Sequence, residues 1–287
     1  MANYSSQNNI SSVEISSSNS SENSSSEFNF SFGKQIQQIE IEGSTREYTL
    51  YLPKSYSTSD SLPLLFSIHG LGSNMDFNFN YTKFDQLAET ENFILVHPNA
   101  LNKSWSTSTD NNLDIIFIQN LIDYLENEYN VNSQRIYVTG MSNGGFFSLA
   151  LACHVSGKIA AVSSVTGTMY RPAINSCQPS KPVPVLQIHG TEDNIVNYST
   201  VENVIEFWTQ HNNTELSVIS SILPDIDPTD GSTVEKFVYT NGDEGVEVHH
   251  LKIIGGSHQW PGYQGNMDID ASKVVWEFMK KYHLNFK

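Results

Sequence analysis

Short apolar runs that end in glycine recur along most of the chain, and they restrict the fold more than any other feature. LPLLFSIHG (residues 62–70) and VPVLQIHG (residues 183–190) are almost continuously apolar. Strands with this pattern are covered by helices on both faces. Further strand candidates of the same kind are FILVHP, RIYVTG, AAVSSVTG and VEVHHLKIIGG.

Helical patterns lie between these runs. LDIIFIQNLIDYLENEY (residues 113–129) carries apolar residues three and four apart. GGFFSLALACHV, TVENVIEFWTQH and ASKVVWEFMKKYH are further helix candidates. Strands that alternate with helices predict βαβ units, and therefore an α/β fold with a mostly parallel central sheet flanked by helices. Ligands of such sheets bind at the carboxyl ends of the strands, so we expect a site among the residues that follow the apolar runs.

The first residues differ from the rest of the chain. MANYSSQNNISSVEISSSNSSENSSSEFNF is mostly Ser and Asn, and its few apolar residues follow no period. Such a stretch buries too little apolar surface to offset the entropy of ordering it. We expect residues 1–31 to form a disordered tether and residues 32–287 to form one domain. That domain opens with QIQQIEIEG and REYTLYLP, whose alternation around Gly43-Ser44 predicts a hairpin.

Charge and the lack of long apolar runs limit the partners. The chain has 31 acidic and 15 basic residues and a formal net charge of -16. This charge repels nucleic acid and anionic membranes, so we expect neither as a partner, and it disfavours strongly anionic polymers as substrates. No run is long enough for a transmembrane helix, and the N-terminus has no signal-peptide pattern. Met1-Ala2 before a polar stretch is typical of an exported protein whose signal was removed; a cytosolic protein with a polar tail is the alternative.

One serine stands between glycines directly after a strand candidate. Gly140-Met141-Ser142-Asn143-Gly144 matches G-x-S-x-G, follows RIYVT and opens the helix candidate GGFFSLALA. The motif needs this context, because a sharp strand-to-helix turn lifts the serine Oγ above the sheet edge. Side chains two residues before and after the serine would collide, which explains both glycines. The pattern predicts that Ser142 is a nucleophile; a glycine-rich turn with an incidental serine is the alternative.

A serine nucleophile needs a base and an acid that orients the base. In α/β-hydrolases the order along the chain is Ser, then Asp or Glu, then His. HGTED follows the strand candidate VPVLQI, and GGSHQWPG follows the last strand candidate. We therefore assign Asp193 as the acid, with Glu192 as the alternative, and His258 as the base.

Other histidines fit the role of the base less well. His249 and His250 lie inside a strand pattern, so at least one should face a packed layer. His154 and His211 lie toward helix ends, where a positive charge suits the helix dipole. His189 precedes the acid too closely to reach it from across the site, which favours a packed or loop-bracing role.

The reaction also needs backbone N–H donors for the developing oxyanion. One donor should be the residue after the nucleophile, Asn143, and the other should come from the loop after the third strand. That loop is HGLGSN, in which the Leu71 N–H is the candidate, while His69 and Gly72 shape the turn.

Two cysteines, Cys153 and Cys177, could form one disulfide if the protein is exported; two buried free thiols are the alternative. No CxxC or HxxxH spacing surrounds them, so we expect no zinc site. DIDPTDGS (residues 225–232) resembles a calcium loop, but its glycine is misplaced and the final glutamate is missing. A hairpin turn before TVEKFVY is the better interpretation, and no metal is expected.

Four motifs together resemble a known family. HGLGSN, GMSNGG, HGTEDNIV and GGSHQWPG are similar to those of the secreted α/β-hydrolase esterases that group feruloyl esterases, acetyl xylan esterases and polyhydroxybutyrate depolymerases. The resemblance implies an α/β-hydrolase catalytic domain that hydrolyses carboxylic esters without a cofactor, the triad Ser142, Asp193 and His258, and a disulfide between Cys153 and Cys177. Ser257 departs from it, because members often have glycine there.

The resemblance leaves several substrates open. A hydroxycinnamate on plant or algal polysaccharide, as in feruloyl esterases, is the first expectation; acetyl xylan and polyesters are the alternatives. Trp105, Trp260 and Tyr170 lie in predicted loops near strand ends, where they could stack on a phenolic acid or a sugar, with ordinary packing as the alternative. A non-catalytic binding protein of the same fold is the alternative of a different class, although such proteins usually lack a triad member. The same triad can also cleave amides.

Overall fold

The computed structural model describes residues 30–108, 112–215 and 217–285. The predicted tether lies, apart from residues 30 and 31, outside the described residues. From residue 31 onward the described residues form one compact unit. None of its described helices combines the length and apolar character that a membrane crossing requires.

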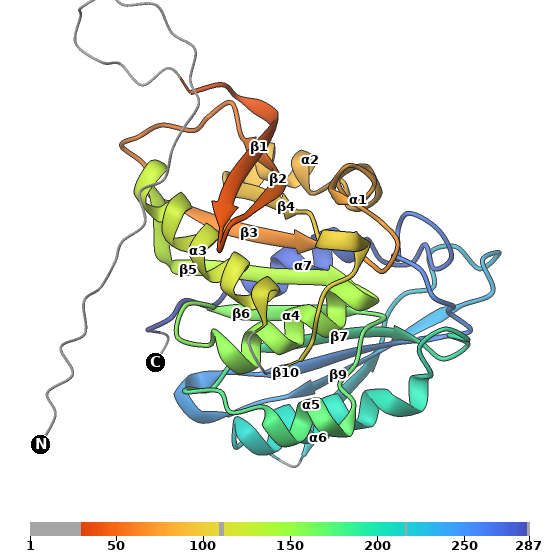
Figure 1. Ribbon diagram of the computed structural model, residues 1–287. Coiled ribbons are helices and arrows are strands. Elements are labelled where there is room, and N and C mark those ends of the chain that lie inside the picture. The colour runs from red at the N-terminus through yellow and green to blue at the C-terminus, as the bar shows by residue number, and fades with distance from the viewer. Residues whose placement is uncertain (1–29, 109–111, 216, 286–287) are drawn as a thin grey trace, which may run out of the picture. The chain divides into compact units, whose positions relative to one another are not determined.

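A single sheet runs through this unit (Figure 1). Its ten strands lie in the order β1-β2-β4-β3-β5-β6-β7-β10-β9-β8. The strands are β1 Gly33–Ile41, β2 Ser44–Leu52, β3 Leu62–Ile68, β4 Ile94–Pro98, β5 Val131–Met141, β6 Ala161–Val165, β7 Val185–Gly190, β8 Val218–Ile222, β9 Thr233–Tyr239 and β10 Val248–Ile254.

The middle of the sheet is parallel and both edges are antiparallel. β4, β3, β5, β6, β7 and β10 pair in parallel. The hairpin of β1 and β2 extends one edge, and β9 and β8 extend the other. Every residue of β3, β4, β6 and β7 is buried, which is why these strands lack alternation. The predicted α/β fold is confirmed.

Helices cover both faces of the sheet (Figure 1). They are α1 Met75–Thr82, α2 Phe84–Glu91, α3 Leu113–Glu128, α4 Asn143–His154, α5 Arg171–Ser176, α6 Val201–His211 and α7 Ala271–Met279. Side chains of α2 and α7, such as Phe84 and Trp276, form a core with Leu65 and Leu186 on one face. Side chains of α4 and α6, such as Leu149 and Trp208, form a second core on the opposite face. The sheet therefore lies between two helical layers, and its carboxyl edge is left to the loops.

Candidate active site

Ser142 occupies the turn between β5 and α4. Its backbone has φ 54° and ψ −122°, a conformation that residues with side chains rarely adopt, and its N–H donates to Val165 O at 2.8 Å. The flanking glycines permit the turn. A methyl group on Gly144 would lie 2.6 Å from His69 O, and one on Gly140 would lie 2.9 Å from Ile68 O. The backbone has the geometry that the G-x-S-x-G pattern predicts.

Asp193 and His258 form a hydrogen-bonded pair at the same edge of the sheet. Asp193 follows β7 and His258 follows β10, which is the parallel neighbour of β7. His258 Nδ1 donates to Asp193 Oδ2 at 2.7 Å, which leaves Nε2 as the acceptor for a proton. The Asp193 carboxylate is fully buried, whereas the His258 side chain is 18% exposed. This exposure suits a base that meets a substrate.

Backbone and side-chain donors hold the Asp193 carboxylate in place. Oδ1 accepts the N–H groups of Ile195 at 2.9 Å and Val196 at 2.8 Å. Oδ2 also lies 3.2 Å from His189 Nε2, which in turn lies 2.9 Å from Val196 O. Because both of these neighbours accept, Nε2 carries the proton, and burial keeps the pKa of His189 below its usual value. His189 thus contacts Asp193 itself as a neutral donor, a contact that the sequence spacing did not predict.

Apart from His189, the residues weighed as alternatives for the acid and the base make no described side-chain contact with Asp193 or His258. Glu192 is exposed, and only its N–H makes a described bond, to Gly256 O at 2.8 Å. His249 and His250 are both buried in β10. His154 and His211 are the last residues of α4 and α6. Among the described residues, His249 Nε2 also lies 2.7 Å from a carboxylate oxygen, Glu247 Oε2, but both residues lie at β10, away from the turn that carries Ser142. Asp193 and His258 are the hydrogen-bonded acid and histidine that lie in loops after the carboxyl ends of parallel strands.

Two backbone N–H groups near Ser142 are free to bind an oxyanion. The Leu71 N–H has no acceptor among the described residues, although the N–H groups of Gly72 and Ser73 both have one. Asn143 is the first residue of α4, where a backbone N–H has no acceptor within the helix. Gly70 brings the two segments together, because a methyl group there would lie 3.5 Å from Ser142 Cβ. Among the described residues, neither Ser142 Oγ nor His258 Nε2 has a hydrogen-bond partner.

Two of the three aromatic residues predicted to contact substrate are buried, which corrects that prediction. Trp105 is 2% exposed, and its Nε1 donates to His69 O at 3.0 Å. Trp260 is 1% exposed, and its Nε1 donates to Ser272 Oγ at 3.1 Å. Neither indole has a face open to a ligand. Tyr170 is 53% exposed and lies against Phe146, with ring centroids 5.1 Å apart, so its contact with substrate stays a prediction.

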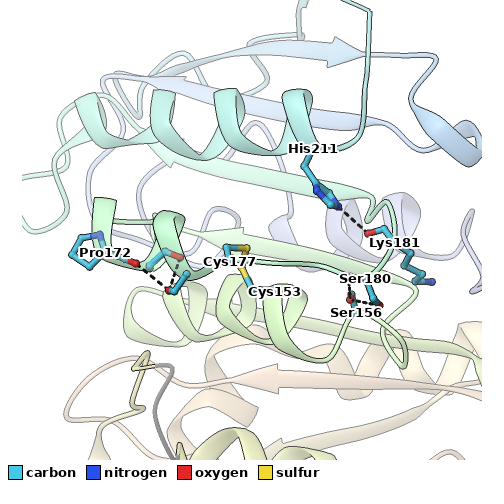
Figure 2. The surroundings of a disulfide bond; sticks show 9 residues. Cys153, Ser156, Pro172, Cys177, Ser180, Lys181 and His211 are labelled. Atoms are coloured by element: carbon cyan, nitrogen blue, oxygen red, sulfur yellow. Dashed lines mark hydrogen bonds between the residues drawn. A yellow bond between two sulfur atoms is a disulfide. The ribbon is translucent and has the colours of Figure 1, made fainter.

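Cys153 and Cys177 form a disulfide (Figure 2). The bond joins the end of α4 to the residue that follows α5, and both cysteines are buried. Close by, Ser156 Oγ lies 3.0 Å from Ser180 Oγ and accepts the Ser180 N–H at 2.9 Å. No three or more His, Cys, Asp or Glu side chains in the described ranges are arranged to hold a metal ion.

Residues 58–242 match the phospholipase/carboxylesterase family. The chain belongs to this family. The match extends from before β3 to the end of β9 and includes Ser142, Asn143 and Asp193, while His258 lies beyond it. The protein is therefore a carboxylic ester hydrolase, and the family resemblance inferred from the four motifs is confirmed.

Individual relatives agree with this assignment. A bifunctional acetylxylan esterase/xylanase of Neocallimastix patriciarum is 27% identical over 84% of this chain, and the chain spans only 34% of the length of that relative. Feruloyl esterase D of Neurospora crassa is 26% identical over 85% of this chain and 84% of its own length. Among solved structures, an acetyl xylan esterase from Aspergillus awamori superposes with a TM-score of 0.67 at 14% identity, covering 86% of this chain and 99% of that one. That likeness shows the α/β fold.

Proposed function

We propose that the protein is a serine esterase that hydrolyses hydroxycinnamate esters carried by a neutral plant or algal polysaccharide. The observation that supports the catalytic assignment best is the 2.7 Å bond from His258 to the buried Asp193 carboxylate, at the sheet edge where Ser142 has its strained backbone. Esters are activated acyl compounds, so a serine, a base and an oxyanion site suffice for their hydrolysis.

The reaction proceeds in two halves. His258 Nε2 takes the proton of Ser142 Oγ while Oγ attacks the ester carbonyl, and the carbonyl oxygen becomes an oxyanion that accepts from the Leu71 and Asn143 N–H groups. Collapse breaks the bond to the alcohol, which leaves with the proton from His258. Water then attacks the acyl-enzyme in the same way and releases the acid. Asp193 stabilises the imidazolium in both halves.

Apolar side chains beside the proposed catalytic groups support an aromatic acyl group. Leu71 is 69% exposed, Ile195 is 73% exposed and Tyr170 is 53% exposed. Each stands near a proposed catalytic group: Leu71 carries one oxyanion donor, Ile195 follows Asp193 by two residues, and Tyr170 packs on Phe146 of the nucleophile helix. We take these three exposed side chains as the apolar surface that would receive the acyl group. The printed names of the relatives, which include feruloyl and acetylxylan esterases, point the same way.

The same exposed side chains favour a second candidate, a polyester depolymerase. An apolar polymer would rest on Leu71 and Ile195 without needing a polar subsite for sugar. The chemistry would be unchanged, because a polyester link is a carboxylic ester.

We also propose that the protein acts outside the cytosol. The disulfide between Cys153 and Cys177 supports this, because such bonds persist in oxidising compartments. A polymeric substrate would also be met outside the cell.

The proposal is tested by a panel of esters with purified wild-type protein and Ser142→Ala. The panel contains methyl ferulate, p-nitrophenyl acetate, p-nitrophenyl butyrate and a hydroxybutyrate oligomer. We expect methyl ferulate to be preferred and Ser142→Ala to lower turnover by about 10⁴ or more without loss of folding. Preference for the acetate would indicate an acetyl esterase, and preference for the oligomer would indicate the depolymerase. Activity retained by Ser142→Ala would refute the nucleophile.

A further inference from the structure

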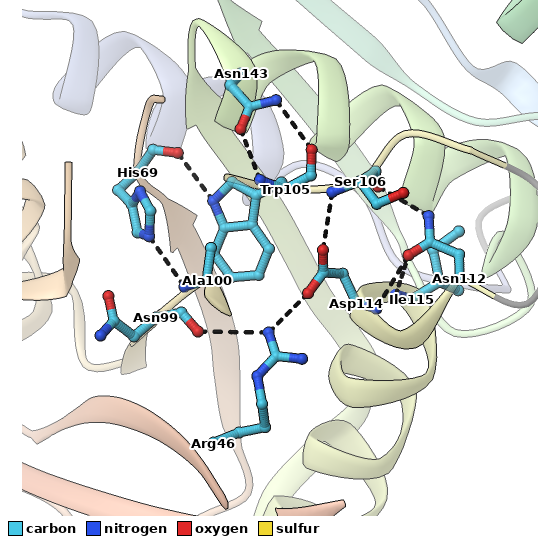
Figure 3. A network of polar contacts seen from close by, with 10 residues as sticks. All are labelled: Arg46, His69, Asn99, Ala100, Trp105, Ser106, Asn112, Asp114, Ile115 and Asn143. Carbon is cyan, nitrogen blue, oxygen red and sulfur yellow. Dashed lines mark hydrogen bonds and ion pairs between the residues drawn. The ribbon is translucent and has the colours of Figure 1, made fainter. Parts of the chain in front are cut away.

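One short segment, residues 99–106, contacts both of the loops that carry the proposed oxyanion donors (Figure 3). Its Lys103 O accepts the Gly72 N–H at 2.8 Å, and its Ala100 N–H donates to His69 Nε2 at 3.1 Å. His69 Nδ1 in turn donates to Gly70 O at 2.8 Å. Since the Gly70 carbonyl and the Leu71 N–H belong to one planar trans peptide, holding the carbonyl on one side fixes the N–H on the other.

The same segment holds the second donor through the side chain of Asn143. The Trp105 N–H donates to Asn143 Oδ1 at 2.8 Å, and Asn143 Nδ2 donates to Trp105 O at 3.1 Å (Figure 3). Two bonds from one planar amide to one backbone residue restrict both the side chain and the backbone that carries it. The Asn143 N–H is therefore oriented by a segment outside the nucleophile turn.

Buried groups anchor the segment to the body of the protein. The Trp105 ring stacks on Phe147 at 4.9 Å and lies 5.1 Å from the His69 ring. The Ser106 N–H donates to Asp114 Oδ2 at 2.8 Å. Asp114 Oδ1 lies 2.8 Å from Arg46 Nη2 in an ion pair whose side chains are 11% and 2% exposed (Figure 3). These contacts tie the segment to β2, α3 and α4 at once.

We propose that residues 99–106 act as a brace that sets the spacing and direction of the two oxyanion donors, and that the Asn143 side chain is the positioning residue through which the brace acts on the second donor. The inference rests on the proposed serine esterase function. Oxyanion donors lower the barrier only when they are oriented before the charge develops. Releasing one donor from its support should weaken transition-state binding more than substrate binding.

The chain offers a matched control for the test. Asn212, the cap residue at the end of α6, makes the same pair of bonds with another backbone residue: the Val183 N–H donates to Asn212 Oδ1 at 3.0 Å, and Asn212 Nδ2 donates to Val183 O at 2.7 Å. Asn143→Ala and Asn212→Ala therefore remove equivalent bonds. Only Asn143→Ala removes them from the proposed oxyanion site.

The experiment measures kcat, KM and thermal stability of both variants on p-nitrophenyl acetate, and the affinity of a phenylboronic acid as an analogue of the tetrahedral intermediate. We expect Asn143→Ala to lower kcat by about tenfold or more, while KM stays within about twofold of the wild-type value. Binding of the boronic acid should weaken by the same factor as kcat. This loss is smaller than the roughly 10²–10³ in rate expected when an oxyanion donor is removed outright. Asn212→Ala should lower the melting temperature while kcat stays at the wild-type value.

Either of two results would overturn the brace: an Asn143→Ala enzyme with wild-type kcat, or equal losses of kcat in the two variants, which would attribute the effect to stability alone. Both results are distinct from failure of the proposed function. That failure would appear as activity retained by Ser142→Ala, whatever the Asn143 variant does.

Discussion

Removing the disulfide should destabilise the enzyme strongly and leave its catalysis intact. The double variant Cys153→Ala/Cys177→Ala frees a loop with a sequence separation of 24 residues. In the chain-entropy description, closing a loop of this length restricts the unfolded state by about 3.5 kcal/mol. Both cysteines belong to the core cluster that includes side chains of α4 and α6, so loss of the two sulfurs also leaves a small cavity that costs about 1 kcal/mol. The expected decrease in the free energy of unfolding is therefore about 4–5 kcal/mol.

Urea unfolding followed by tryptophan fluorescence measures this decrease, because Trp105, Trp208, Trp260 and Trp276 are all buried. The unfolding midpoint should fall by about 1 M or more. Wild-type protein treated with dithiothreitol should move toward the variant. Catalysis at 25 °C should be unchanged, because Cys153 lies about 16 Å along α4 from the nucleophile turn.

Ser156→Ala supplies the comparison. Ser156 links the same two segments as the disulfide, through hydrogen bonds to Ser180, but without closing the loop covalently (Figure 2). Its loss should cost about 1–2 kcal/mol. If the cysteine variant loses no more stability than Ser156→Ala, the reasoning from loop closure is wrong.

Two further predictions concern acid stability and substrate affinity. Burial lowers the pKa of His97 to about 3, whereas the same group in the unfolded chain titrates near 6.5. Between these two pH values the unfolded chain binds a proton that the folded chain excludes. The free energy of unfolding should therefore fall as the pH is lowered from about 6.5 toward 3. Urea midpoints across this range should decline less steeply in His97→Gln, and parallel curves would contradict the assignment. Ile195→Ser should raise KM for methyl ferulate about fivefold, because it removes roughly 1 kcal/mol of apolar contact with the substrate. The value of kcat should stay constant, because the backbone N–H of residue 195 still donates to Asp193 Oδ1. Initial-rate kinetics measure this effect, with Ile226→Ser as the control, since Ile226 is similarly exposed and lies in the connection between β8 and β9. An equal rise in KM in both variants would contradict a specific contact between Ile195 and the substrate.

The parallel core could be predicted because each strand carries its own signal. β3 and β7 are almost continuously apolar and end at the glycine-containing turns that lead into the site, and α3 between them carries apolar residues three and four apart. α1 lacks such a signal, because MDFNFNYT spreads its aromatic residues without a helical stripe. It is a short helix that ends at Lys83, which has φ 53° and separates it from the equally short α2. β8 is exposed along its length and is held by its pairing with β9, a relation that no local pattern reveals.

The three residues proposed as the triad could be placed at one edge of the sheet from the sequence for a similar reason. Ser142, Asp193 and His258 each lie within four residues of the end of a recognisable strand, and parallel strands deliver their carboxyl ends to one edge. The second contact of Asp193, with His189, was not predictable, because the two residues are only four apart and their approach depends on how the loop after β7 folds back through Val196.

Trp105 shows where such reasoning ends. A tryptophan in a loop near a strand end is typical of a residue that stacks on a substrate. The sequence contains nothing that distinguishes such an exposed tryptophan from one that packs inside the protein. The distinction depends on partners distant in the chain: His69 accepts the indole N–H, Phe147 stacks on the ring and Asn143 binds the backbone. These partners turn Trp105 inward, so a residue predicted to bind substrate instead supports the groups proposed to bind the oxyanion. Specificity therefore has to be sought among the exposed side chains of Leu71, Tyr170 and Ile195, whereas Trp105 and Asn143 should govern rate.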